Sequence, residues 1–349
     1  MGTIPIKFKS KVITLHSARV QPKFDAQTVL CDSPWEYVKL RLLQEGNKNA
    51  QFYWEQARHF YKATQLLPYE ASPLTSYYSI LNATKALLEK FNQTSYAEQH
   101  GVVGSKISNR TSLSNEQVTI QTSGVLGALT RFLGYTLHEN KNYDLKCVFY
   151  NMPFIHRAYL LTFTSSTNQF VPITESHFVR KEQSYEAWFE ATVHQRYTKN
   201  LESVLPDQFE RCKNVKTSFV IREKKRFKWF HGNQNKSIKN LTSYHNKIRK
   251  HFFPIFSPEN RWYLKKNSAS NNHIDLPQLV LIYSALHRIS ELSRYDPIRL
   301  SKHFNTQHNW LLTEFLRLAP AQFIHRIAAE MTGNEFLVPD TFGIDSDSV

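Results

Sequence analysis

The most regular helical pattern in the chain covers residues 72–88, which read SPLTSYYSILNATKALL. Ser72 and Pro73 predict a helix start, because a serine side chain can accept a hydrogen bond from the first free amides and proline already has a helical φ angle. Apolar residues then recur at helical spacing on two faces, one containing Leu81 and the other Ile80. A helix that is apolar on two faces needs neighbours on two sides, so the sequence predicts a central helix.

Further helical patterns lie on both sides of this stretch. Serine or aspartate followed by proline opens several of them, as at Asp296-Pro297, and Gly333 stands where a last helix would end. The sequence therefore predicts a mainly α fold, a helical bundle in which the N- and C-terminal thirds pack together. The expected helices cover residues 34–43, 49–67, 73–91, 276–294, 297–318 and 320–331.

The middle of the chain has a different pattern. Residues 170–179 and 218–230 are rich in β-branched and aromatic side chains, which predicts strands, and residues 185–197 between them predict a helix. We therefore expect a smaller α+β insertion within the helical fold. The predicted parts are an N-terminal helical part at 1–159, a basic α+β insertion at 160–235, and a C-terminal helical part at 236–349 that packs on the N-terminal helices.

Composition favours a soluble cytoplasmic protein. The chain has 349 residues, of which 41% are hydrophobic, so it can bury a large core. Cys31, Cys147 and Cys212 form no CxxC pair, which argues against a disulfide framework or a zinc ribbon and fits a reducing compartment. The first residues lack the apolar core of a signal peptide, and no apolar run approaches the roughly 18 residues of a membrane span.

Positive charge is concentrated in one segment. The whole chain has a net charge of +15, and residues 211–266 hold sixteen Lys and Arg against two acids. Aromatic residues are interleaved with these cations, and cations with flat rings are what single-stranded nucleic acid requires. The alternative is a solvated basic face over rings that belong to the core. The candidate nucleic-acid-binding residues are Lys224, Lys225, Arg226, Lys228, Trp229, Lys247, Arg249 and Lys250.

Two further candidates involve histidine. Arg294, Arg299 and His303 form a dense polar cluster, in which the two arginines could clamp phosphate and His303 could act as acid or base. Alternatively, Asp296 caps a helix there and Arg294 pairs with an acid elsewhere. His100 either holds a turn or lines a cleft. The candidate catalytic residues are therefore Arg299, His303, Arg294 and His100.

Motifs for common cofactors are missing from the sequence. It contains no Walker A, GxGxxG or GxSxG motif, which disfavours ATP, NAD and α/β-hydrolase chemistry. Its histidines form no HxxxH or HxH pair that would indicate a metal site. We therefore expect no cofactor and no bound metal.

Several short motifs give the chain a family resemblance. In their order it resembles YaaC-like proteins, over the stretch from about Trp35 to Phe323. This resemblance implies a bacterial, cytoplasmic, mostly helical protein without an assigned activity. The motifs are Ser72-Pro73-Leu74 with Tyr77-Tyr78, His100-Gly101-Val102, Arg261-Trp262-Tyr263-Leu264 and Ser293-Arg294-Tyr295-Asp296-Pro297.

A weaker resemblance is to HEPN domains, which are helical bundles that often dimerise and often cut RNA. The paired tyrosines of the central helix and the following His-Gly are similar to that pattern. Active HEPN nucleases use an Arg and a His a few residues apart, and the nearest pairs here are Arg226 with His231 and Arg299 with His303. This resemblance implies a homodimer, a metal-independent ribonuclease, and an effector role in bacterial defence or stress.

Three functions follow as hypotheses. The first is binding of RNA or single-stranded DNA through the basic aromatic-rich segment. The second is a non-catalytic interaction subunit that docks an acidic protein partner. The third is a HEPN-like ribonuclease.

Overall fold

The chain folds into two compact units, each built from separate stretches of sequence. The computed structural model describes residues 2–94, 98–197, 205–215, 217–259, 261–267 and 272–338. Unit 1 comprises Met1–Asp32, Gln169–Ser270 and Gly333–Val349, and unit 2 comprises Ser33–Asn168 and Asn271–Thr332. The boundaries expected at residues 159 and 235 therefore fall inside the units, the first in unit 2 and the second in unit 1.

Unit 2 is mostly helical and includes one small sheet. Its three strands pair antiparallel in the order β5-β6-β7. Short 3₁₀ turns at Leu113–Asn115 and Pro153–Ile155 complete it. Its elements are α1 (Trp35–Gln44), α2 (Lys48–Gln65), α3 (Ser72–Lys90), β5 (Val102–Lys106), β6 (Glu116–Ile120), α4 (Gly124–Phe132), β7 (Lys141–Asp144), α5 (Leu145–Tyr150), α6 (His156–Thr162), α8 (Gln278–Tyr295), α9 (Pro297–Phe304) and α10 (Asn309–Thr332).

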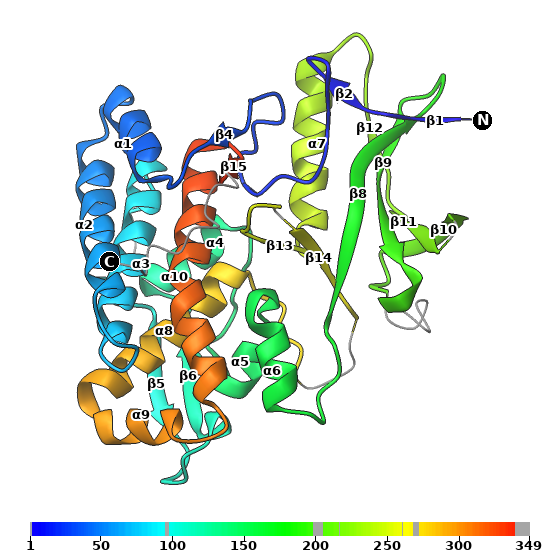
Figure 1. Ribbon diagram of the computed structural model, residues 1–349. Coiled ribbons are helices and arrows are strands. Elements are labelled where there is room, and N and C mark those ends of the chain that lie inside the picture. The colour runs from blue at the N-terminus through cyan, green and yellow to red at the C-terminus, as the bar shows by residue number, and fades with distance from the viewer. Residues whose placement is uncertain are drawn as a thin grey trace, which may run out of the picture. The chain divides into compact units, whose positions relative to one another are not determined.

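Helix α3 is the centre of unit 2, as its sequence predicts. It contacts α2, α4, α8 and α10, so helices from both ends of the chain meet around it (Figure 1). Ile80 and Leu87 on one face are completely buried, and Leu81 on the other face is also buried, so α3 is covered on two sides. Ser72 does not cap the helix as expected. It lies inside the first turn, and its hydroxyl donates to the carbonyl of Tyr69 at 3.3 Å.

Unit 1 is dominated by an eight-stranded antiparallel sheet with the order β10-β11-β9-β8-β14-β13, to which β1 and β12 add at the sides. Strands β4 and β15 form a separate parallel pair. The residues 195–197 make one 3₁₀ turn. The elements are β1 (Thr3–Pro5), β2 (Lys7–Phe8), β3 (Lys11–Val12), β4 (Val29–Leu30), β8 (Phe170–Lys181), β9 (Glu186–His194), β10 (Phe209–Val215), β11 (Ser218–Glu223), β12 (Phe227–Lys228), α7 (Gln234–Ile248), β13 (Phe252–Ile255), β14 (Arg261–Lys265) and β15 (Phe336–Leu337).

The core of unit 1 forms between one face of this sheet and helix α7. Leu241, Tyr244 and Ile248 project from α7 at helical spacing and belong to one apolar cluster with Phe178 and Phe189 of the sheet. The aromatic rings pack at angles to one another, with the Phe178 and Phe189 centroids 5.4 Å apart. Burying several aromatic side chains here supplies most of the apolar area that a sheet with a single covering helix needs.

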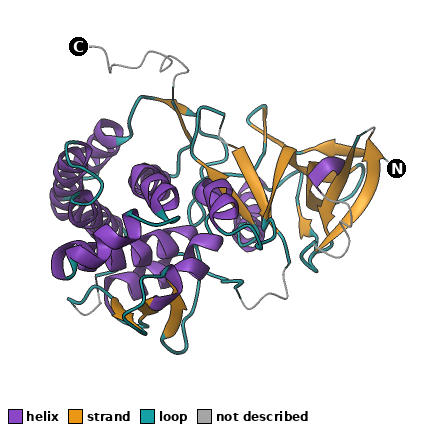
Figure 2. Cartoon of the chain, turned by 60° about the horizontal axis from the view of Figure 1, so that its bottom comes forward, coloured by secondary structure: helices purple, strands orange, loops and turns teal. Residues whose placement is uncertain are grey.

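The predicted fold class was wrong. The described residues form a mixed α/β protein, with helices prevailing in unit 2 and strands in unit 1 (Figure 2), and not a mainly α helical bundle with a small insertion. The helix expected at 185–197 is strand β9, which lies inside the sheet between β8 and β11. The strand expected at 218–230 is broken into β11 and β12. Pro320 does not restart a helix but lies inside α10.

Other predicted features were right. Asp296 caps α9, because its Oδ1 accepts a hydrogen bond from the amide of Arg299 at 3.2 Å. Gly333 follows α10 with a φ angle of +71°, the left-handed conformation typical of the residue after a helix. None of the helices within the described ranges is both long enough and apolar enough to span a bilayer.

Candidate functional site

The predicted cations of unit 1 form an exposed group, here called the cationic surface and made of Lys224, Lys225, Arg226, Lys228 and Lys247. The first three lie in the connection between β11 and β12, Lys228 lies in β12, and Lys247 lies near the end of α7. All five side chains are exposed. None of them forms an ion pair with any residue that the structure describes, so their charges are not neutralised by a neighbouring carboxylate within this part of the chain.

The rings beside these cations point into the core. Phe227 and Trp229 are 8% and 7% exposed, and both belong to the apolar cluster of unit 1. Trp229 therefore offers little ring surface for base stacking. Arg226 stacks with its guanidinium 4.5 Å from the ring centre of Trp188, which holds its side chain along the sheet. The cations thus supply charge, and the rings supply packing.

Arg249 occupies a different environment from the rest of the candidate set. Its buried guanidinium donates to the backbone carbonyls of His16, Ser17 and Phe252, and it lies 4.6 Å from the ring centre of Trp262. These contacts join the N-terminal segment to α7 and the hairpin of unit 1. Arg249 is thus positioned as a structural residue, and Lys250 beside it is half-buried.

Glu223 is a buried acid next to the cationic surface. Its side chain is 4% exposed, and its Oε2 has no hydrogen-bond partner among the described residues. Burial raises the pKa of Glu223 to about 7, although Tyr244 and the cations Lys225, Lys247 and Arg226 act in the opposite direction. Near neutral pH this carboxyl is therefore only partly charged and does little to offset the neighbouring cations.

A second polar group lies in unit 2 around Glu116. This carboxylate is completely buried, and it binds Arg288 NH2 at 2.7 Å, His303 Nε2 at 3.0 Å and Arg299 Nε. Burial alone would raise the pKa of Glu116, but the hydrogen bonds from His303, Arg288 and Arg299 outweigh it and lower the pKa to about 2. Glu116 is thus ionised and is the counterion of two buried arginines.

The predicted catalytic residues do not converge on one site. Arg299 and His303 both face Glu116, and Arg299 also donates to three backbone carbonyls between residues 108 and 110. Arg294 is exposed and lies over the ring of Tyr295 at 4.8 Å. Arg299 and His303 are both buried, so neither side chain faces solvent. Their catalytic role stays a prediction, and each has a structural role in this fold.

His100 belongs to a separate hydrogen-bonded group with Tyr77 and Tyr283. Its Nδ1 lies 2.7 Å from the Tyr77 hydroxyl, which lies 3.2 Å from the Tyr283 hydroxyl, and Tyr283 donates to the His100 carbonyl at 3.2 Å. All three contacts are satisfied only if Tyr77 donates to Tyr283 and His100 Nδ1 donates to Tyr77. In this arrangement Nδ1 of His100 carries the proton and Nε2 carries the lone pair, and the His100 side chain is exposed.

The ring of His287 packs against this group. It lies 5.0 Å from the Tyr77 ring and 5.6 Å from the His100 ring, and its Nδ1 is 3.8 Å from Glu291 Oε1. Burial lowers the pKa of His287 to about 3, with contributions from His100 and Arg288, so this histidine is neutral at physiological pH. Glu291 in turn binds Arg288 at 3.1 Å, which links the His100 group to Glu116.

Sequence reasoning missed Glu116, Arg288, Glu291 and His287. Glu116 follows a polar loop and begins a short strand, and nothing local distinguishes it from a solvated glutamate. Arg288, Glu291 and His287 lie in a helix whose pattern indicates only burial. The one available signal was the placement of His287 and Arg288 among the apolar residues of α8, because unpaired charged residues are rarely buried.

Comparison with known proteins gives one match. The profile of the family described as YaaC-like Protein matches residues 25–331. No curated protein and no solved structure matches the chain. The expected likeness to HEPN domains has no support, because neither a structural match nor a helical bundle accompanies it, and the defence role inferred from that likeness has none either. With a match over most of its length, the chain belongs to the YaaC-like protein family.

Proposed function

We propose that this protein binds nucleic acid, RNA or single-stranded DNA, through the cationic surface of unit 1. The observation that carries the proposal is the exposure of Lys224, Lys225, Arg226, Lys228 and Lys247 without ion-pair partners among the described residues. Unpaired, exposed cations that are close together create a strong local field and attract phosphate groups.

Affinity in this proposal comes mainly from phosphate contacts. Because Phe227 and Trp229 are buried, the rings interleaved with these cations offer little surface for stacking on bases. Binding there should consequently depend little on sequence and strongly on salt concentration. An acidic protein partner would be attracted by the same charges, and this is the alternative that the experiment must separate.

The test is the triple variant Lys224→Gln, Arg226→Gln and Lys228→Gln. Each lost phosphate contact should reduce the slope of log affinity against log salt by roughly 0.7–1, so the triple variant should lose about 2–3 slope units. Thermal stability should change little, because exposed charges contribute little to it. The assay is a fluorescence-anisotropy titration with single-stranded RNA and DNA of mixed sequence at several salt concentrations.

A matched control removes the same charge from unit 2. Lys48, Lys62 and Lys302 are exposed there and form no ion pair with a described residue, so the three Lys→Gln changes should leave the affinity and its salt slope unchanged. Equal affinity of the wild type and the cationic-surface variant would refute the proposal. Poly-glutamate binding as tightly as RNA at matched charge would favour the acidic-partner alternative.

A further inference from the structure

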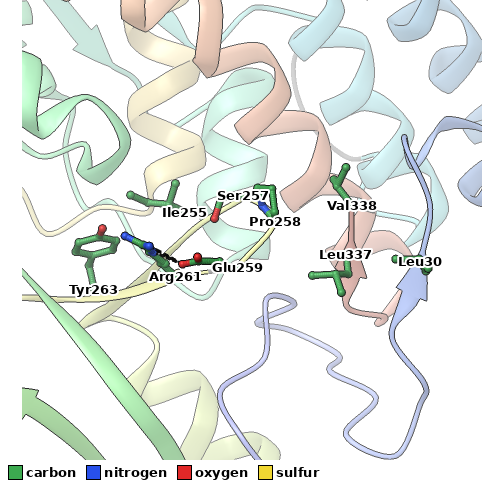
Figure 3. Close-up of a pocket in the computed structure, with 9 residues that line it drawn as sticks. All are labelled: Leu30, Ile255, Ser257, Pro258, Glu259, Arg261, Tyr263, Leu337 and Val338. Atoms are coloured by element: carbon green, nitrogen blue, oxygen red, sulfur yellow. Dashed lines mark hydrogen bonds and ion pairs between the residues drawn. The ribbon is translucent and has the colours of Figure 1, made fainter. Parts of the chain in front are cut away.

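Unit 1 contains an open cavity of about 800 Å³, and none of the residues that line it belongs to the cationic surface. One wall comes from the hairpin of β13 and β14, with Ile255 and Tyr263, and the opposite wall comes from β4 and β15, with Leu30 and Leu337 (Figure 3). Sites for small ligands usually measure about 300–1,000 Å³ and combine apolar walls with a few polar groups. The cavity has the size and lining of such a site.

The charged groups of the cavity are Glu259 and Arg261, which lie on the hairpin wall together with Ser257, whose buried Oγ has no hydrogen-bond partner among the described residues (Figure 3). Arg261 Nε and NH2 contact the same carboxylate oxygen, Glu259 Oε2, at 2.6 and 2.5 Å. Glu259 Oε1 has no hydrogen-bond partner among the described residues, and the five-donor guanidinium, which also interacts with the side chain of Tyr263, keeps further N–H groups. An acceptor and a donor thus stand side by side where the cavity meets solvent.

A third feature is the half-buried ring of Tyr263, which lies next to Arg261 in the hairpin wall (Figure 3). A half-buried ring is held in place by packing and still offers part of its surface to a ligand. Flat ligands such as bases stack favourably on a ring of this kind. The cavity therefore suits a flat, mostly apolar ligand whose edge carries both hydrogen-bond donors and an acceptor.

We propose that this cavity binds a single unstacked nucleobase, with Tyr263 stacking on the base while Glu259 and Arg261 bind its edge. The choice of a base rests on the proposed function, because unit 1 also holds the basic segment 211–266. Guanine fits best, since its edge offers two neighbouring N–H donors to the acceptor-only carboxylate and a carbonyl oxygen to the guanidinium. The protein would accordingly favour single-stranded over duplex nucleic acid, because bases in a duplex are paired and stacked.

The cavity and the cationic surface can be tested separately because they lie far apart on the sheet. Phe227 of β12 is level with Arg180 of β8 through β9, whereas Tyr263 of β14, which lines the cavity, pairs with Pro172 of β8. Eight residues of β8 separate these levels, and a bulge between Thr174 and His177 interrupts the strand, so the separation is at most about 26 Å at about 3.3 Å per residue. A nucleoside, which has no phosphate, can occupy the cavity without touching the cationic surface.

The experiment is isothermal titration calorimetry of the full-length protein with guanosine, cytidine and uridine. Guanosine should bind most tightly, and Glu259→Gln should weaken it at least tenfold, because the amide replaces an acceptor-only group by one that is half donor. Tyr263→Leu should weaken all three nucleosides about equally. The matched control is Tyr185→Leu, which removes an exposed tyrosine of unit 1 outside the cavity and should leave nucleoside binding unchanged.

The variants also separate this inference from the proposed function. Replacing Lys224, Arg226 and Lys228 with Gln should reduce RNA binding and leave guanosine binding intact. No heat of binding for any nucleoside at millimolar concentration would overturn the cavity proposal while leaving the cationic surface untouched. Guanosine binding that persists in the Glu259→Gln, Tyr263→Leu double variant would also overturn the cavity proposal. Displacement of guanosine by an uncharged peptide amide at equal concentration would overturn it as well.

Discussion

Replacing Glu116 with Gln should destabilise the protein severely. The carboxylate is completely buried and is the counterion of Arg288 and Arg299 in unit 2. Removing one partner of a buried ion pair typically costs about 3–5 kcal/mol, because the other charge is left uncompensated in the interior. Arg288 retains Glu291, whereas Arg299 has no second carboxylate among the described residues. Because one of the two arginines keeps a carboxylate partner, we expect the free energy of unfolding to fall by about 3 kcal/mol, the lower end of this range.

The pH dependence of stability gives a second value for the same set of contacts. The pKa of Glu116 falls from 4.5 to about 2 in the folded protein. A lowered carboxyl pKa stabilises the folded state above pH 4.5, and this stabilisation is lost as the pH falls from 4.5 towards 2. At about 1.4 kcal/mol per pKa unit, the full difference is about 3 kcal/mol. The two routes agree.

The assay is urea denaturation of the wild type and the Glu116→Gln variant at pH 7, 5 and 3. The variant should be less stable by about 3 kcal/mol at pH 7, and the gap should shrink at pH 3, because Glu116 of the unfolded wild-type chain is protonated at that pH whereas the folded protein keeps it ionised. Glu314→Gln is the matched control, because Glu314 also binds an arginine but at the surface, so it should cost less than about 1 kcal/mol. A cost below about 1 kcal/mol for Glu116→Gln, or a gap independent of pH, would show that the reasoning is wrong.

Two further substitutions test the core of each unit. Leu81→Ala in α3 should lower the free energy of unfolding by about 2–5 kcal/mol in chemical denaturation. The control is Leu66→Ala, at a side chain that is 87% exposed, which should lower it by less than about 0.5 kcal/mol. Equal losses for the two variants would contradict the central position of α3. Glu223→Gln should stabilise the protein at pH 8 by up to about 3 kcal/mol and have little effect at pH 4. The reason is that the folded protein raises the pKa of the Glu223 carboxyl to about 7, which stabilises the folded state below pH 4.5, and this stabilisation is lost as the pH rises through 7. An equal effect of Glu223→Gln at pH 4 and pH 8 in thermal unfolding would contradict this prediction.

The helices of unit 2 could be predicted because their signals are local. Pro73 and Asp296 mark helix starts within a few residues of the apolar pattern that follows, and both helices begin where the pattern places them. The expected end at residue 318 was wrong, because α9 stops at Phe304 and α10 begins at Asn309. Strand β9 could not be identified in the same way. Its Ala187 and Ala191 favour a helix. They alternate with polar residues and face the core together with Phe189 and Val193, but this pattern specifies a strand only when β8 and β11 pair with β9 on its two sides. Those partners are set by the whole sheet.

The same distinction applies to the candidate sites. Lys224, Arg226 and Lys228 are exposed while Phe227 and Trp229 are buried, which agrees with the alternative interpretation of a basic face over rings that belong to the core. Contacts between residues that are far apart in the sequence could not be predicted. Glu116 binds Arg299 across 183 positions, and no local pattern of either residue indicates the other.

The charged residues of the two units therefore serve different ends. In unit 2 the arginines of α8 and α9 are buried against Glu116, so their charge is used within the fold and changing it should alter stability. In unit 1 most of the surplus cations are exposed, while the rings beside them hold the core together, so the charge there can be changed without unfolding the sheet. Nearly all the net charge lies in residues 211–266, which is why we assign the proposed nucleic-acid binding to unit 1.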